Sequence, residues 1–265
     1  MNETTATETQ NETRYNIRVL DRAIRVLFLL SDAKPRNLNE ISEEISLSPS
    51  TTFRLLSTLS YYHFVKRDER TGHYRLGLDC LTLARGFQDS NDLRTVALPE
   101  LEALRDFTKE TVHLAILDNM EVIYIEKLPG LHAIGLMSSR VGGRSPVHCT
   151  GLGKMFLANF KRDQVLAFIE KYGLPRYTDT TITDPGELIS HLEQIRQHGY
   201  AFDKGEHEPD VRCIAAPIFN SEGQTIAALS VSGPAIRLDP LEEQTDLIYQ
   251  TVQTAINISR QMGYA

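Results

Sequence analysis

The chain has 265 residues, of which 41% are hydrophobic and 24% are charged, and its formal net charge is −7. This length suffices for about two domains, and no apolar run approaches the roughly 20 residues that a membrane-spanning helix needs. The three cysteines are scattered, which fits reduced thiols better than a disulfide framework. These features predict a two-domain cytoplasmic protein and exclude a disulfide-stapled secreted scaffold.

The charges are unevenly distributed along the chain. Between Arg14 and Arg85 there are 12 Lys and Arg residues against 8 Asp and Glu residues, so this third is basic while the rest of the chain is acidic. Such asymmetry is typical of a nucleic-acid-binding domain attached to a sensing domain. The polar residues 1–13, rich in Thr and Glu, are predicted to form a disordered tail.

Three helices are predicted in the basic third. The second one is predicted to begin at an N-cap on Asn39 and to turn Ile41 and Ile45 inward. The third begins at Ser48-Pro49, because a hydroxyl N-cap followed by proline favours a helix start, and runs to about Tyr61. The first, over residues 18–30, is amphipathic, and its predicted inner face consists of Leu20, Ala23, Ile24, Leu27 and Leu30.

The third helix and the segment after it predict a winged helix-turn-helix, a fold that places one helix in the major groove of DNA. The helix buries Thr52, Leu55, Leu56 and Leu59, and two short strands follow around a polar turn that ends in Gly72. Hydroxyl and guanidinium groups suit base edges, and basic groups on the wing suit phosphates. A winged helix used only for protein contacts is the alternative. The predicted DNA contacts are Ser48, Ser50, Thr51, Arg54, Ser57, Lys66, Arg67, Arg70 and Arg75.

The predicted domain organisation is a winged helix-turn-helix domain over residues 14–77, a linker helix over 78–93 and a second domain over 94–265. In that domain, helices are predicted over 94–109, from Thr150, from Asp184 to Gly199 and from Asp239-Pro240 almost to the end. Because the strands come mostly as hairpins, the class is α+β, an antiparallel sheet flanked by helices. The predicted strands are 112–117, 122–128, 133–138, 200–203, 213–219 and 225–232.

Two features of the second domain are typical of ligand binding. Ser230 and Ser232 share one face of an apolar strand, although such hydroxyls also often bond neighbouring backbone. Gly151 and Gly153 lie at a helix start, where free N–H groups attract small anions.

Six segments in order give the chain a family resemblance: RVLDRAIRVLFLL, SPSTTFRLLSTL, TGHYRLG, GGRSPVHCTGLGKMFLA, HGYAFDKGEHEPDVRCIAAPIF and LSVSGP. It resembles IclR-type transcriptional regulators. The resemblance implies a GAF-like effector domain, no cofactor, and homodimers that often pair into homotetramers on palindromic operators. It implies a DNA-binding regulator, expected here to be a repressor, whose effector is a small organic or aromatic acid. The implied effector contacts are Met137, Ser145, Gly151, Leu152, Asp203, Cys213, Ser230 and Ser232.

The sequence departs from the family pattern at the helix start, where Leu152 is larger than usual and Thr150 replaces a common Ser. The sequence leaves three other interpretations open. One is a hydrolase with a Cys nucleophile and a His base, but no nucleophile elbow is present, so we predict that the protein is not an enzyme. Another is a GAF-like small-molecule or zinc sensor that acts through protein partners without binding DNA. A zinc site is chemically permissible but matches no structural-zinc spacing; it would use His148, Cys149, His207 and Cys213.

Overall fold

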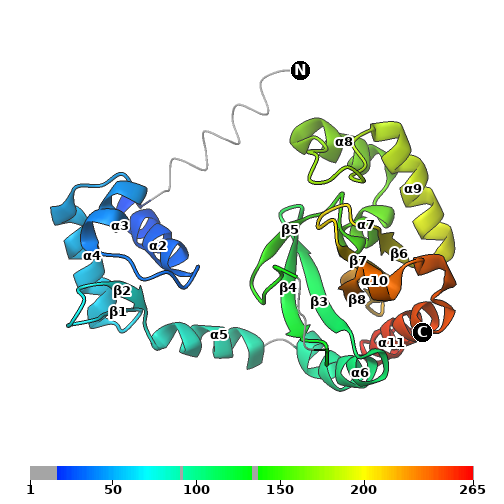
Figure 1. Cartoon of the computed structure of the whole chain (residues 1–265), viewed down its shortest axis with the longest axis horizontal. Helices are drawn as coiled ribbons and strands as arrows, with labels where there is room; N and C mark the ends of the chain where they lie inside the picture. The colour runs from blue at the N-terminus through cyan, green and yellow to red at the C-terminus, as the bar shows by residue number, and fades with distance from the viewer. Residues whose placement is uncertain (1–16, 90–91, 133–136, 265) are drawn as a thin grey trace. The chain divides into compact units, whose positions relative to one another are not determined.

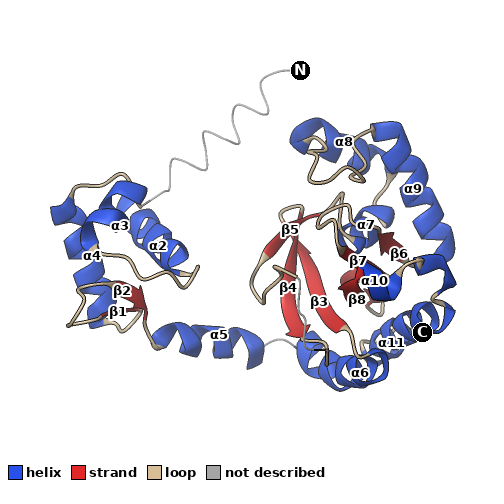
Figure 2. Cartoon of the chain, viewed as in Figure 1, coloured by secondary structure: helices blue, strands red, loops and turns tan. Residues whose placement is uncertain are grey.

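The computed structural model describes residues 17–89, 92–132 and 137–264 (Figures 1 and 2). The chain divides into two compact units, Met1–Ser90 and Asn91–Ala265, each with its own hydrophobic core. The division falls inside the range predicted for the linker. The predicted tail and residues 133–136 of the predicted strand 133–138 lie outside the described residues, and Met137 and Ser138 are not in a strand.

In the N-terminal unit, the described residues 17–89 form three helices and a hairpin, followed by a further helix. The chain runs through α2 (Arg18–Leu30), α3 (Leu38–Glu44), α4 (Pro49–Tyr61), β1 (Val65–Arg67), β2 (Tyr74–Leu76) and α5 (Asp79–Asp89). Helix α4 begins as predicted, since the Ser48 side chain accepts a hydrogen bond from the backbone N–H of Thr51. The cap of α3 is Asn37 rather than the predicted Asn39, because Asn37 and Glu40 form a reciprocal capping box.

The core of the N-terminal unit corrects part of the predicted inner face of α2. Val26 and Leu30 are buried against α3, α4 and the hairpin, whereas Leu20 and Ile24 are 56% and 42% exposed. Of the predicted inner face, Leu30 is buried and Ala23 and Leu27 pack against the core, so the prediction is confirmed at these three positions and wrong at Leu20 and Ile24. Ile41, Ile45, Leu56 and Leu59 are buried as predicted.

The C-terminal unit is built on an antiparallel sheet. Its described strands form one six-stranded sheet in the order β5-β4-β3-β8-β7-β6, with every neighbouring pair antiparallel. This architecture, with helices around the sheet, confirms the predicted α+β class. The strands are β3 (Thr111–Asp118), β4 (Glu121–Leu128), β5 (Arg144–Pro146), β6 (Ala201–Asp203), β7 (Val211–Phe219) and β8 (Thr225–Pro234).

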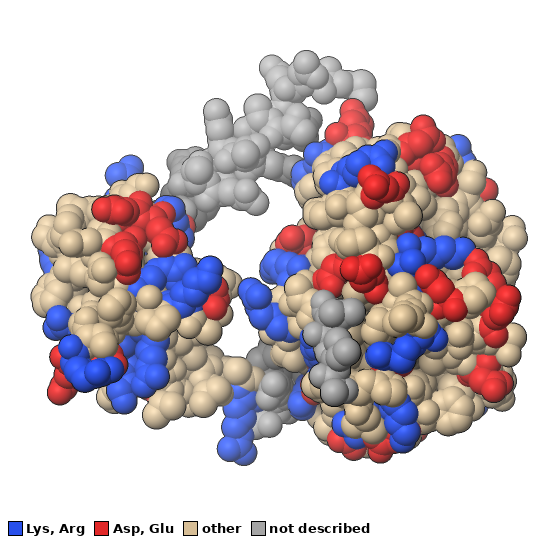
Figure 3. Space-filling model, viewed as in Figure 1, with Lys and Arg blue, Asp and Glu red and all other residues tan. Residues whose placement is uncertain are grey.

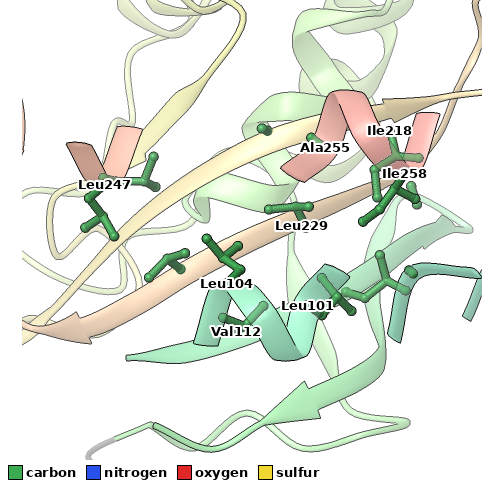
Figure 4. Packing of buried hydrophobic residues seen from close by; sticks show 14 of the residues in the cluster. Leu101, Leu104, Val112, Ile218, Leu229, Leu247, Ala255 and Ile258 are labelled. Atoms are coloured by element: carbon green, nitrogen blue, oxygen red, sulfur yellow. The ribbon is translucent and has the colours of Figure 1, made fainter. Parts of the chain in front are cut away.

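Helices pack on both faces of this sheet. Helices α6 (Asp92–Thr108) and α11 (Thr245–Gln261) pack together on one face. Figure 4 shows that core, with Leu101 and Leu104 of α6 meeting Leu229 of β8. The other face is covered by α7 (Gly151–Ala158), which packs on α9 (Pro185–His198). The helices α8 (Arg162–Tyr172) and α10 (Ala235–Leu238) complete the unit.

The last helix starts later than predicted. A short 3-10 turn occupies Leu241–Glu243, and α11 begins only at Thr245. The intervening Gln244 has φ −80° and ψ 54°, which is not helical, so the backbone is interrupted there. The strand β5 and the helices α8 and α10 were not predicted.

Candidate functional site

A small cavity of about 40 Å³, partly open to solvent and lined by many polar side chains, lies between the sheet and the start of α7. Strands β3, β4, β6, β7 and β8 contribute to its wall, as do α7 and the loops at 137–139 and 207–208. Among the described residues that line it, none carries a permanent positive charge. The lining residues are His113, Tyr124, Met137, Ser139, Thr150, Gly151, Leu152, Asp203, His207, Glu208, Val211, Cys213, Ser230 and Ser232.

Sheet register brings the strand residues of the cavity together. Ser232 is paired with Cys213 on β7, and Cys213 is paired with Asp203 on β6. Two positions along, Ser230 is paired with His113 on β3. Side chains that are directly opposite in an antiparallel pair share one face of the sheet, so residues far apart in the sequence form one polar surface.

His113 is the central hydrogen-bonding group of this surface. The residue is 3% exposed. Its Nε2 lies 2.9 Å from the hydroxyl of Ser139, and its Nδ1 lies 3.4–3.5 Å from the hydroxyls of Ser230 and Ser232. Burial, reinforced by the positive charge of Lys127, lowers the pKa of His113 to about 3. The imidazole is therefore neutral at physiological pH and offers one donor and one acceptor.

Asp203 is a buried acid held at the edge of the cavity. Its Oδ1 accepts hydrogen bonds from the backbone N–H groups of Gly205 (3.0 Å) and Glu206 (2.7 Å). Burial raises the pKa of Asp203 to about 7, against the opposing effect of the nearby Lys154 ammonium. Lys154 is itself buried and pairs with Glu206. Asp203 therefore changes its protonation within the physiological pH range.

Cys213 is not activated as a nucleophile. Its thiol is buried and accepts a hydrogen bond from the Ser232 hydroxyl at 3.1 Å. Burial and the neighbouring Asp203 raise the pKa of Cys213 to about 11. The thiolate is the reactive form of cysteine, so this thiol is suited to packing and weak hydrogen bonding rather than to catalysis.

The two glycines at the start of α7 have different roles. The side chain of Thr150 caps the helix by accepting from the N–H of Gly153 at 3.1 Å. The first N–H groups of a helix have no acceptor within it, and both Gly151 and Leu152 line the cavity. A Cβ on Gly153 would lie 2.3 Å from the backbone of Val147, so that glycine permits close packing rather than ligand access.

The structure brings seven of the eight predicted effector residues to this one cavity. The exception is Ser145, which lies on β5, donates to the Tyr124 hydroxyl at 3.2 Å and faces a neighbouring groove. It therefore supports the cavity wall through Tyr124 instead of lining it. Sequence reasoning missed several lining residues, of which His113 is the most central. Its position opposite Ser230 follows from strand register, which the sequence does not display.

The residues of the alternative zinc site do not converge. Cys213 and His207 line the cavity, whereas His148 faces the neighbouring groove and its Nε2 donates to the carbonyl oxygen of Pro175, 3.0 Å away. Tyr177 lies between the rings of His148 and His207. Within the described ranges, no group of three or more His, Cys, Asp and Glu residues is arranged to hold a metal ion.

In the N-terminal unit, the predicted DNA contacts lie on the surface. Ser50, Arg54 and Ser57 are exposed on α4, and Thr51 is half-buried. Ser48 is exposed but its hydroxyl is engaged in capping α4. The wing residues Lys66, Arg67, Arg70 and Arg75 are exposed as well. Figure 3 shows Lys and Arg side chains gathered at the hairpin end of this unit.

The chain matches known proteins over nearly its whole length. The family model for the C-terminal domain of the bacterial transcriptional regulator IclR matches residues 87–260, and that for the IclR helix-turn-helix domain matches residues 19–69. The HTH-type transcriptional regulator XynR of Escherichia coli (strain K12) is 36% identical, covering 94% of this chain and 98% of that protein. The transcriptional repressor IclR of the same organism is 34% identical, covering 84% and 82% respectively.

Solved structures agree with this match. The crystal structure of an IclR homolog from Microbacterium hydrocarbonoxydans complexed with 4-hydroxybenzoate has a TM-score of 0.80 at 30% identity, covering 92% of this chain and 98% of that one. The chain belongs to the IclR family of DNA-binding transcriptional regulators, with an N-terminal helix-turn-helix domain and a C-terminal effector-binding domain. The predicted family is thus confirmed. No helix in the described part of the chain is long and apolar enough to cross a membrane.

Proposed function

We propose that this protein is a repressor in the cytoplasm whose affinity for a palindromic operator is controlled by a small carboxylic acid bound in the C-terminal cavity. The observation that carries the proposal is the convergence of Gly151, Asp203, Cys213, Ser230 and Ser232 on one polar cavity. Their neighbours Met137 and Leu152 supply apolar contacts at its edge. In this proposal the protein acts by binding DNA and the acid, without catalysis.

The chemistry of the lining favours a monocarboxylate that also carries a hydroxyl or carbonyl group. The start of α7 offers backbone N–H groups and the positive end of the helix dipole to a carboxylate. His113, Ser230 and Ser232 offer donors and acceptors to a second polar group. Asp203 accommodates an anion in its protonated form. The 4-hydroxybenzoate bound by the Microbacterium homolog is an acid of this kind.

Self-association is proposed to occur through α2. Ile17, Leu20, Ile24 and Phe28 are exposed and lie at helical spacing along this element. Exposed apolar stripes of this kind are typical of interfaces, and a two-fold dimer would present two copies of α4 to successive major grooves. We therefore propose homodimers, paired into homotetramers, on half-sites about 34 Å apart or a multiple of it.

The effector is proposed to act by changing the balance between two arrangements of the protein. A ligand shifts such an equilibrium only through its different affinities for the two states. Binding in the cavity would therefore favour the arrangement in which the reading helices no longer match the operator spacing.

Arg54→Ala is expected to weaken operator binding by about 1–3 kcal/mol, because a guanidinium that forks onto guanine supplies base discrimination of that size. The measurement is a titration of a fluorescent duplex from the region upstream of the gene, at several salt concentrations. Arg70→Ala, on the wing, is the matched control and should weaken all duplexes alike while reducing the salt slope. Unchanged affinity of the Arg54 variant would remove this residue from base reading.

The double change Ser230→Ala and Ser232→Ala is expected to leave operator affinity intact and to weaken effector binding by about tenfold, the effect of losing roughly one net hydrogen bond. The test is the concentration of 4-hydroxybenzoate, or of a better acid from a thermal-shift screen, that releases the duplex. Ser221→Ala, on an exposed turn outside the cavity lining, is the control and should respond to the acid as the wild type does. Loss of folding in the double variant, seen by circular dichroism, would make the hydroxyls structural.

A further inference from the structure

One exposed aromatic side chain on α4 has no structural role in its own unit. Phe53 is 50% exposed. It is not one of the described residues that pack on the core of the N-terminal unit. The inward face of the same helix is complete without it, since Thr52, Leu55, Leu56 and Leu59 are buried there. The half of the side-chain surface that stays in water forgoes the free energy of burial, so the ring is available for a contact outside its own unit.

The position of Phe53 on the helix places it among the proposed base-reading groups. It lies three residues after Ser50 and four before Ser57, spacings that put side chains side by side on a helix surface. Arg54 is its neighbour in sequence and is also exposed. Phe53 is therefore part of the same face as the three polar side chains.

The surroundings of the ring favour a small apolar target over a protein partner. Within residues 49–60, all of which the structure describes, Phe53 is the one large hydrophobic residue that is exposed. The exposed side chains around it carry hydroxyl groups and a guanidinium group. A docked protein would need a continuous apolar patch. In the major groove, an A·T pair presents one methyl group on thymine beside hydrogen-bonding atoms on both bases. One ring among polar groups is complementary to that pattern.

We infer that Phe53 contacts the C5-methyl group of a thymine in each operator half-site and so helps to determine sequence specificity. This inference rests on the proposed role of α4 as the reading helix. Ser50 or Ser57 would then lie next to the polar edge of the same base pair, while Arg54 reads a neighbouring position.

The test removes the methyl group from the DNA rather than the side chain from the protein. The full-length chain selects its strongest duplex from a randomised pool, and each thymine of one half-site is then replaced singly by uracil, which lacks only that methyl. We expect one position at which the replacement weakens wild-type binding about fourfold, the equivalent of about 0.8 kcal/mol for one buried carbon group. The Phe53→Ala variant should bind the thymine and uracil duplexes equally well at that position.

Two variants make the outcome specific. Tyr61→Ala removes another exposed aromatic of α4, and its response to uracil should match that of the wild type. Thermal melting of both variants verifies folding. A methyl effect that persists in Phe53→Ala, or no methyl effect at any thymine, would overturn the inference. Failure to select any duplex, or an unchanged affinity in Arg54→Ala, would instead contradict the proposed reading role of α4.

Discussion

Replacing Gly153 by alanine is expected to destabilise the C-terminal unit by about 3 kcal/mol or more, the upper range of overpacking effects. The added Cβ would lie 2.3 Å from both the Cα and the carbonyl oxygen of Val147. Both contacts are with backbone, so no side-chain rotation relieves them, and α7 must move away from the segment that precedes it. Helix α7 forms one wall of the cavity, so the variant should also lose effector binding.

The measurement is thermal unfolding followed by circular dichroism, with an expected fall in Tm of roughly 6–12 °C for a unit of this size. Gly151→Ala is the matched control two residues earlier. Its Cβ would lie 3.3 Å from the Ala215 side chain and 3.4 Å from Cys213 Sγ, contacts that small shifts can relieve. That variant should keep its stability but respond poorly to the effector, because the methyl group intrudes into the cavity. Equal stability losses in the two variants would contradict this distinction.

The stability of the wild-type protein, measured against Asp203→Asn, is expected to fall by roughly 3 kcal/mol between pH 5 and pH 8. Burial raises the pKa of Asp203 from its ordinary 3.8 to about 7 in the folded protein. The folded state therefore holds this proton more tightly than the unfolded state. Its contribution to stability is complete below about pH 4 and is lost as the pH rises through about 7. An asparagine mimics the protonated acid and lacks this dependence.

Urea unfolding of both proteins at half-unit steps from pH 5 to pH 8 gives the comparison, and only the difference between the two curves reports Asp203. The asparagine can still accept the backbone hydrogen bonds from Gly205 and Glu206, so that support of the loop is retained. Parallel curves for the two proteins would show that the acid is ionised throughout. The same proton would affect the proposed binding of an acid, since an ionised Asp203 would repel an anion in the cavity.

The sequence predicted correctly those helix starts that are determined by residues within one turn of the start. Ser48 and Pro49 define the start of α4 because capping and the proline ring act within one turn. The orientation of α2 could not be predicted in the same way. Leu20 and Val26 are both apolar and both fit a helical period, and only the packing of α3 and the hairpin determines that Val26 is the buried one. The three-residue strand β5 contains Pro146 and is too short to show any alternation.

The cavity was predictable in part, because strand alternation indicated Ser230 and Ser232, the helix start indicated Gly151, and the family resemblance added the other predicted residues. Asp203, Cys213 and Ser232 were named from motifs, and strand register explains why those motifs meet. His113 lies about a hundred residues before these motifs, in strand β3, whose sequence is otherwise typical of a buried core strand. Its place beside Ser230 depends on the pairing of β3 with β8, a long-range contact that leaves no local signature in the sequence.

Strand β8 belongs to two layers of the C-terminal unit at once. Its Ser230 and Ser232 face the cavity, while the alternating Leu229 and Val231 belong to the core that α6 and α11 complete. A single strand, β8, therefore separates the cavity from the helices on the other face of the sheet. A movement of its backbone would displace the residues on both faces. Helix α6 is the element through which the chain enters this unit from the reading domain. A displacement of β8 by a ligand in the cavity would therefore reach α6 through the packed side chains of Leu229 and Val231.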